Sequence, residues 1–288
     1  MFAKWLFSLA SQLNMSPHIT TPTSSLPLSG IYDLMMTPYV PFVAIFVYNA
    51  AVWCWDNANK QRLGAAKKND ESGSNAPRTS SAVRNVIIAH NLVLAVYSIW
   101  TFIDFMPAVI ESVQTQGFAT AFCDTNWTLW NTKLLKHGYL FYLSKYYEFI
   151  DTFIILYKGK SPGRLQTFHH SGAVLIMWLG NYVQSAYLAF FVFENSIIHS
   201  LMYTYYTVTA MGFKPPGKQW LTRMQIMQFY VALTAGIAYL GLPQCQNSEQ
   251  RVFVYLFIPY ILELIRLFNA FARQTYGKPG PQLAEKTN

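Results

Sequence analysis

Apolar stretches of about 20 residues, the length that crosses the ~30 Å hydrocarbon core of a bilayer as a helix, recur along this chain with short polar segments between them. Only 12% of the residues are charged, against roughly 25% in ordinary soluble domains. The pattern predicts an all-α integral membrane protein with one seven-helix domain over residues 34–272. The expected spans are residues 34–55, 86–106, 134–156, 166–181, 184–211, 224–243 and 252–272.

Lysine and arginine are distributed unevenly between the predicted loops. Fifteen of the 21 fall on one side of the membrane and four on the other, with Lys145 and Arg266 inside spans. Because positive residues accumulate in cytoplasmic loops, residues 1–33 are predicted to be a flexible lumenal segment and residues 273–288 a cytosolic tail. Residues 60–81 are predicted to be a solvated cytosolic loop. The net charge of +8 therefore suits lipid headgroups or coenzyme phosphates, and needs no nucleic acid.

The three cysteines are divided by this topology. Cys123 and Cys245 fall in the two predicted lumenal loops, and Cys54 lies at the cytosolic end of the first span. A Cys123–Cys245 disulfide is one hypothesis and two free thiols is the other. Glycosylation sequons at Asn14 and Asn126 are also predicted to be lumenal.

Charged and amide side chains cluster within four of the predicted spans. Such groups are costly to place in a membrane and are candidates for function. Lys145, Glu148 and Asp151 follow one another at intervals of three residues, which places them roughly on one helical face. We expect them to converge with polar residues of the next three spans in one cavity open to the cytosol. Those residues are Gln166, His169 and His170, then Asn195, His199, Met202, Tyr203 and Tyr206, then Gln225 and Gln228.

A purely structural role is open for each group. Lys145, Glu148 and Asp151 could neutralise one another as a buried network. His169 and His170 could be an interfacial pair bonded to loop carbonyls, and His199 a satisfied core histidine. His90 and His137 have no polar residue at helical spacing, so both are predicted to be structural.

Four segments resemble the motifs of one family, the elongases of very-long-chain and polyunsaturated fatty acids. SKYYEFIDT at 144–152 resembles its K-x-x-E-x-x-D-T motif, and LQTFHH at 165–170 its histidine box. NSIIHSLMYTYY at 195–206 resembles N-x-x-x-H-x-x-M-Y-x-Y-Y, and TRMQIMQF at 222–229 resembles T-x-x-Q-x-x-Q. The resemblance implies an enzyme of the endoplasmic reticulum membrane with a tunnel for the acyl chain between its helices.

One position departs from the family pattern. The box is usually H-x-x-H-H, whereas Gln166 stands at its first position. This resembles a subset of elongases from microalgae and related organisms, and implies a polyunsaturated acyl substrate.

The implied reaction condenses an acyl-CoA with malonyl-CoA to 3-oxoacyl-CoA, carbon dioxide and CoA. With no cysteine expected near the cluster, an imidazole would carry any covalent step. We assign acyl transfer to His169 with His199 facing it, and orientation or proton transfer to His170. Lys145 would pair with Glu148 or Asp151, or stabilise developing negative charge. The amides of Gln166, Asn195, Gln225 and Gln228 would position the thioester, enolate or CoA atoms, and the candidates for the CoA phosphates are Lys158, Lys160, Arg164, Lys214, Lys218 and Arg223.

The resemblance implies no metal or other cofactor, and partnership with the ketoacyl reductase, dehydratase and enoyl reductase of the elongation cycle. The oligomeric state is open, a homodimer included. Two rival classes are considered. A membrane di-iron desaturase or hydroxylase also carries histidine boxes, but needs about eight histidines where this chain has six. A seven-helix receptor or transporter would have this length, but is not expected to carry histidine pairs beside a charged helical face.

Overall fold

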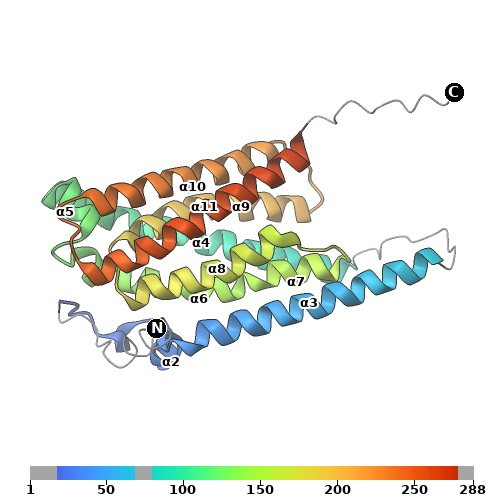
Figure 1. Cartoon of the computed structure of the whole chain (residues 1–288), viewed down its shortest axis with the longest axis horizontal. Coiled ribbons are helices and arrows are strands. Elements are labelled where there is room, and N and C mark those ends of the chain that lie inside the picture. The colour runs from blue at the N-terminus through green and yellow to red at the C-terminus, as the bar shows by residue number, and fades with distance from the viewer. Residues whose placement is uncertain (1–17, 69–79, 278–288) are drawn as a thin grey trace.

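The computed structural model of the protein describes residues 18–68 and 80–277, and this part of the chain is all-helical (Figure 1). Each predicted span overlaps a helical segment. The longer segments are α3 (Tyr39–Lys68), α4 (Ser81–Gln116), α6 (Leu135–Tyr147), α7 (Phe149–Tyr157), α8 (Gly163–Tyr182), α9 (Tyr187–Ala210), α10 (Lys218–Gly241) and α11 (Ser248–Tyr276). The shorter ones are α2 (Tyr32–Met36), α5 (Phe118–Cys123) and a π-helical turn over Trp130–Leu134.

Four of the described helices are long and apolar enough to cross a membrane: α3 over Tyr39–Arg62, α4, α10 and α11. These findings are those of an all-helical membrane protein. The predicted third, fourth and fifth spans correspond to α6 with α7, α8 and α9, which carry the clustered polar side chains. α6 and α7 have 13 and 9 residues, so each alone is too short to cross a membrane. That all seven cross the membrane, and that they enclose a tunnel, stays a prediction.

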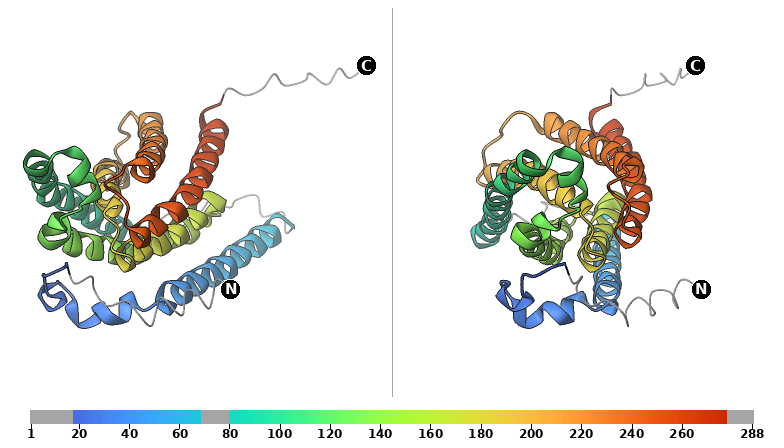
Figure 2. Two further views of the ribbon diagram at one scale, coloured as in Figure 1. Left: turned by 60° about the vertical axis from the view of Figure 1, so that its left-hand side comes forward. Right: turned by 90° about the vertical axis from the view of Figure 1, so that its left-hand side faces the viewer.

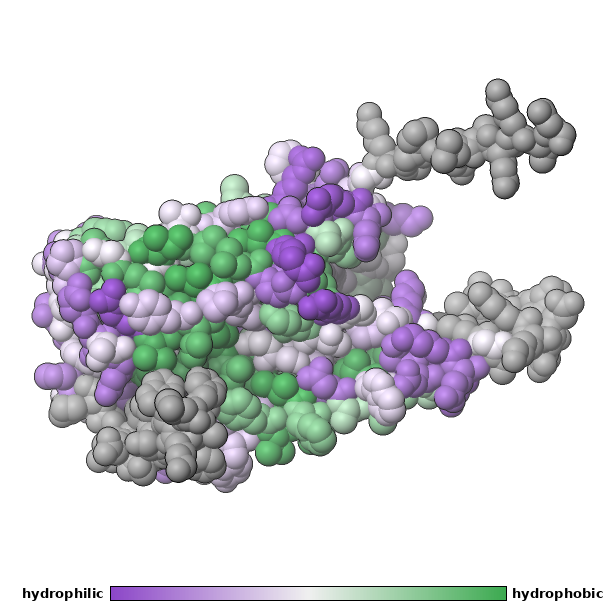
Figure 3. All heavy atoms as spheres, in the orientation of Figure 1, coloured by the Kyte–Doolittle hydropathy of each residue, from purple (hydrophilic) through white to green (hydrophobic). Residues whose placement is uncertain are grey.

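The helices form an elongated bundle in which α4 packs along α9, and α11 packs against both α10 and α8. The two views in Figure 2 place α3 at the outside of this bundle, where it contacts α7 and α8. On the face drawn in Figure 3, hydrophobic residues cover much of the middle, and hydrophilic residues gather toward the ends of the helices. A band of this kind suits a hydrocarbon layer between two aqueous surfaces.

The structure corrects two predictions about segments outside the membrane. Residues 60–68, predicted to be solvated loop, continue α3 as helix, and Lys60 pairs with Asp56 one turn earlier at 2.6 Å. Residues 18–33, predicted to be flexible, form short turns with buried Leu26. Sequence periodicity misses the second case because the contacts are with residues more than 100 positions away, including four hydrogen bonds from Thr20 and Thr21 to Asn131.

Other sequence predictions lie outside the described residues. They concern the sequon at Asn14, residues 69–79 of the predicted loop and the last residues of the tail, 278–288.

A disulfide joins the two segments that were predicted to be lumenal loops. Cys123 ends α5 and Cys245 lies between α10 and α11; the structure bonds their sulfur atoms, with Cα atoms 4.9 Å apart across 122 residues of sequence. Both cysteines are buried, whereas Cys54 is an exposed free thiol. The crosslink fastens the α10–α11 hairpin to the end of α4 through α5.

Replacing both Cys123 and Cys245 by alanine is expected to lower the free energy of unfolding by about 2–5 kcal/mol, because the unfolded chain regains the freedom of a long loop. The measurement is the melting temperature of the purified protein in detergent. Cys54→Ala is the matched control and should melt like the unchanged protein. Equal melting temperatures for all three proteins would contradict the prediction.

Candidate active site

A buried ion pair at the end of α6 forms the centre of the polar cluster. Nζ of Lys145 donates to Oε1 of Glu148 at 2.7 Å and to Oδ1 of Asn195 at 3.2 Å. Nδ1 of His199 lies 3.6 Å from the same Glu148 oxygen. Each of these four residues is at most 5% exposed. The sequence placed them on two helices, and the structure brings them into contact between α6 and α9.

Asp151 belongs to a second part of the cluster. Its Oδ1 lies 2.9 Å from Nε2 of His90 on α4, and its Oδ2 accepts a hydrogen bond from Tyr203 on α9 at 2.7 Å. His90, which was predicted to be structural because no polar residue stands at helical spacing, therefore has a polar partner on another helix. Its partner lies 61 residues away on another helix, so spacing within α4 could not reveal it. His137 likewise finds a partner across helices, Asp104 at 2.7 Å.

Gln166 links the charged helix to the histidine box. Its side-chain nitrogen lies 3.3 Å from Oγ1 of Thr152 and 2.7 Å from Nε2 of His170. Because an amide nitrogen only donates, Nε2 of His170 accepts, and the proton of the neutral ring is on Nδ1. Thr152 in turn bonds the hydroxyl of Tyr48 on α3 at 2.8 Å. Gln166, at the first position of the box, therefore orients the buried imidazole of His170.

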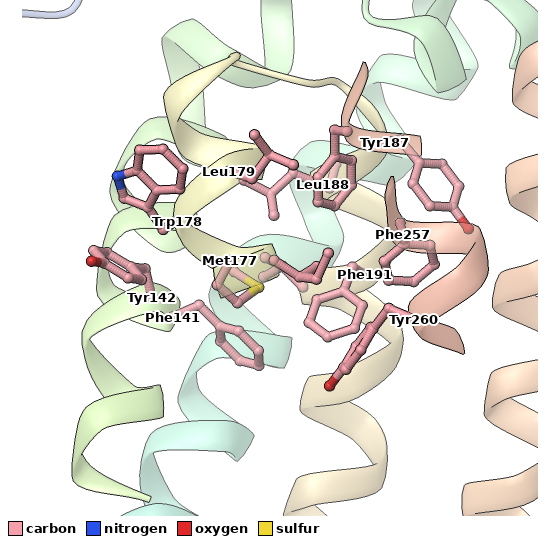
Figure 4. Packing of buried hydrophobic residues seen from close by; sticks show 14 of the residues in the cluster. Phe141, Tyr142, Met177, Trp178, Leu179, Tyr187, Leu188, Phe191, Phe257 and Tyr260 are labelled. Carbon is pink, nitrogen blue, oxygen red and sulfur yellow. The ribbon is translucent and has the colours of Figure 1, made fainter. Parts of the chain in front are cut away.

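His169 is contacted by a tyrosine from another helix. The hydroxyl of Tyr260 on α11 lies 3.2 Å from its Nδ1 and 3.1 Å from its backbone oxygen. Figure 4 shows Tyr260 at the edge of a packed cluster of large side chains, with its hydroxyl directed away from the neighbouring rings. Lys145 acts electrostatically on all three imidazoles, and His199 is within electrostatic range of His169 and His170. The three histidines and the lysine therefore share one region, in which Lys145, His170 and His199 are buried and His169 is partly exposed.

The remaining predicted site residues lie toward the end of α9 and the start of α10. Nε2 of Gln225 donates to the sulfur of Met202 at 3.2 Å. Gln228 is buried, and its Oε1 has no hydrogen-bond partner within the described residues. Tyr206 is 40% exposed, so it stands at the rim of the cluster, whereas Tyr203 is buried.

The basic residues predicted for the coenzyme lie at the ends of helices, apart from the buried cluster. Arg164 pairs with Glu263 at 3.4 Å. Burial, and then the neighbouring charge of Lys160, lower the pKa of Lys158. A bound phosphate would favour the charged form of that lysine. Of the other three, Lys214 and Lys218 lie at the α9–α10 connection and Arg223 lies near the start of α10.

Sequence reasoning missed three residues of the site, His90, Tyr48 and Tyr260. His90 and Tyr48 have no polar residue three or four positions away on their own helices, and the one that Tyr260 has, Glu263, pairs with Arg164 and Arg266. Periodicity therefore did not point from these residues to the cluster. Over residues 18–68 and 80–277 no group of three or more His, Cys, Asp and Glu side chains is arranged to hold a metal ion.

Tyr203→Phe is expected to lower turnover by about tenfold or more, because a hydrogen bond to a charged group contributes roughly 1.5–3 kcal/mol and Asp151 would lose one of its two partners. Turnover per molecule is measured in membranes as malonyl-CoA-dependent release of carbon dioxide. Tyr205→Phe, which removes a hydroxyl two residues away, should leave it unchanged. Equal turnover in the two variants would show that the bond does not matter.

Comparison with known proteins gives consistent matches. Residues 33–283 match the GNS1/SUR4 (ELO) family. The chain is 27% identical over 231 residues to fatty acid elongase 2 of Trypanosoma cruzi, covering 74% of this chain and 81% of that protein. It is 30% identical over 202 residues to a putative fatty acid elongase of Dictyostelium discoideum, covering 69% and 68%. It is also 30% identical over 209 residues to very long chain fatty acid elongase 5 of Xenopus tropicalis, covering 70% and 68%.

Proposed function

Because the chain belongs to the GNS1/SUR4 (ELO) family of fatty acid elongases, we propose that its buried cluster performs the condensation of acyl-CoA with malonyl-CoA through histidine. The protein is a 3-oxoacyl-CoA synthase and a multi-pass membrane enzyme. Membership of this family argues against the two rival classes, the di-iron desaturases and the seven-helix receptors or transporters.

The first step is acyl transfer to an imidazole. The hydroxyl of Tyr260 lies within hydrogen-bond distance of Nδ1 of His169, so Nε2 is the nitrogen that is free to attack. Its attack on the thioester carbonyl forms an acyl-imidazole and breaks the carbon–sulfur bond. His169 loses its ring proton. The departing CoA thiolate takes up one proton and leaves as CoA. His199 is suited to relay this proton, since its Nδ1 lies near Glu148.

The second step uses malonyl-CoA. Loss of its carboxylate as carbon dioxide leaves an enolate, whose carbon attacks the acyl-imidazole and forms the new carbon–carbon bond of 3-oxoacyl-CoA. The carbon–nitrogen bond breaks, and the imidazole takes up one proton from solvent, which is the proton that the overall condensation consumes. Lys145 and the amide of Asn195, which bond each other at 3.2 Å, would stabilise the negative charge that develops on the thioester oxygen. Gln166 would keep His170 in one tautomer for proton transfer.

The observation that carries this proposal is the convergence of α6, α8 and α9 on one buried region. Lys145, Glu148, Asn195 and His199 are in contact there, and His169 and His170 are within electrostatic range of them. A cation, carboxylate and imidazoles held together out of water suit acyl transfer followed by enolate chemistry.

The covalent step can be trapped. Purified enzyme incubated with acyl-CoA and no malonyl-CoA is expected to release about one CoA per molecule and to gain the mass of one acyl group, which peptide mass spectrometry should locate on His169. His169→Gln should abolish both signals. Stoichiometric CoA release without an adduct on a histidine would contradict a histidine intermediate.

Several finer features belong to the same proposal. The glutamine at position 166 supports a polyunsaturated acyl substrate, as in the microalgal subset of the family. The positive loops support seven spans in the endoplasmic reticulum membrane, with a lumenal N-terminus and a cytosolic C-terminus. We assign residues 34–272 to the membrane domain, with the acyl chain in a tunnel between helices. The reductases and the dehydratase of the elongation cycle would consume the product.

The substrate class is tested by expressing the protein in a yeast-like host and feeding single fatty acids. Lipid profiles are expected to show two-carbon elongation of polyunsaturated acids in preference to saturated acids of the same length. Preferential elongation of the saturated acids would overturn the substrate class while leaving the condensing activity in place.

A further inference from the structure

Polar contacts fasten α3 to the bundle, although this helix lies at its outside (Figure 2). Asn49 donates to Oγ of Ser171 on α8 at 2.9 Å, and Asn59 donates to the backbone oxygen of Leu156 on α7 at 2.8 Å. A helix that served only to hold the chain in lipid would need neither bond. The two bonds fix the register of α3 along α7 and α8.

This register places Tyr48 of α3 beside the histidine box. Tyr48 is 2% exposed, and its ring stacks on Phe149 with ring centroids 4.1 Å apart. The ring centroids of Phe149 and His170 are 6.5 Å apart. The hydroxyl of Tyr48 lies 2.8 Å from Oγ1 of Thr152. The outer helix therefore reaches the active site with a buried tyrosine.

A chain of hydrogen bonds continues from this hydroxyl to His170. The side-chain nitrogen of Gln166 lies 3.3 Å from Oγ1 of Thr152 and 2.7 Å from Nε2 of His170. Each of the two N–H groups of the amide thus has one acceptor, and Oγ1 of Thr152 is one of them. The proton of the Thr152 hydroxyl is then available to Tyr48.

The same heavy atoms would also allow the opposite polarity. If the amide of Gln166 turned by half a rotation, its oxygen would face both Thr152 and His170. Thr152 would donate its hydroxyl proton to that oxygen, and His170 would donate to it from Nε2, as the other neutral tautomer. The direction of one hydroxyl proton therefore decides which nitrogen of His170 carries the hydrogen.

We propose that Tyr48 is a positioning residue that accepts the hydroxyl proton of Thr152 and thereby keeps the hydrogen of His170 on Nδ1. With this proton directed to α3, a turned amide would bring two acceptor oxygens together and lose a hydrogen bond. The inference rests on the proposed role of His170 in proton transfer. In the other tautomer Nδ1, the nitrogen that Gln166 leaves free, would offer a lone pair instead of an N–H.

The first test removes only the hydroxyl. Tyr48→Phe keeps the ring that stacks on Phe149, and it is expected to lower kcat by about tenfold, the upper end of what one neutral hydrogen bond contributes. KM for acyl-CoA and the melting temperature in detergent should stay unchanged. The rate is malonyl-CoA-dependent release of carbon dioxide by the purified full-length protein. Tyr39→Phe, which removes an exposed hydroxyl at the start of the same helix, is the control and should keep the normal rate.

A double-mutant cycle separates positioning from packing. In Gln166→Met there is no amide to orient, so adding Tyr48→Phe should lower the remaining rate no further. A tenfold loss in both backgrounds would show that the hydroxyl acts independently of the amide, and would overturn the proposal. An unchanged kcat in Tyr48→Phe alone would overturn it as well.

The tautomer is observed directly by NMR of the ring nitrogens, in protein isotope-labelled at histidine and solubilised in detergent. Signals that are missing from His170→Gln belong to His170. The unchanged protein is expected to carry the hydrogen on Nδ1, and Tyr48→Phe to carry part of it on Nε2. The hydrogen remaining wholly on Nδ1 in Tyr48→Phe would contradict the inference. This measurement does not use turnover, so it stays decisive even if normal turnover in His170→Gln refutes the proton-transfer role.

Discussion

Replacing His199 by glutamine is expected to lower formation of 3-oxoacyl-CoA by about 10²–10⁴-fold, the range contributed by a positioned acid–base group. His169→Gln is expected to have an effect at least as large, because it removes the proposed nucleophile. Glutamine keeps polar character and much of the size of histidine, so the buried neighbours lose little packing. The measurement is incorporation of labelled malonyl-CoA in membranes, divided by the amount of protein.

The control separates catalysis from folding. His18→Gln alters a histidine outside the polar cluster, which stacks on Trp127, and should leave turnover per molecule unchanged. If the buried histidines only complete the core, the variants would accumulate less protein while each molecule kept its normal turnover. That pattern would refute the acyl-transfer role.

Spacing within one helix predicted the central pair of the site. Lys145 and Glu148 are three residues apart, so they lie on neighbouring positions of one face, and the structure joins them at 2.7 Å. The same reasoning misplaced Asp151. Six residues beyond Lys145 correspond to a rotation of about 600°, or 240° net. Asp151 therefore points to α4 and bonds His90 rather than the lysine.

The sequence did not predict contacts between residues that are far apart in the chain. The apolar stretches of α4, α10 and α11 are a local property of the sequence, so all three helices were predicted, although α4 ends at Gln116, ten residues after the predicted end of its span. Which faces meet depends on how all the helices pack together. The bond between Tyr260 and His169 joins residues 91 positions apart, and no local pattern marks Tyr260 as different from other tyrosines in the chain.

Lys145→Met is expected to lower the free energy of unfolding by about 3–5 kcal/mol, because it leaves Glu148 buried without its cation. Both residues are 2% exposed, so water cannot replace the lost partner. Turnover should fall with stability. The melting temperature of purified protein in detergent and the rate per molecule are measured on the same preparation. Unchanged stability would mean that Glu148 is already neutral in the folded protein.

The double variant Lys145→Met with Glu148→Met distinguishes a structural ion pair from a catalytic one. Removing both charges often restores stability, since neither is then left unpaired in the interior. The double variant is therefore expected to melt near the unchanged protein and still fail to form 3-oxoacyl-CoA, because Asn195 and His199 would face a site without a charge to stabilise the enolate. Recovery of turnover together with stability would assign the pair to folding alone and leave the chemistry to the histidines.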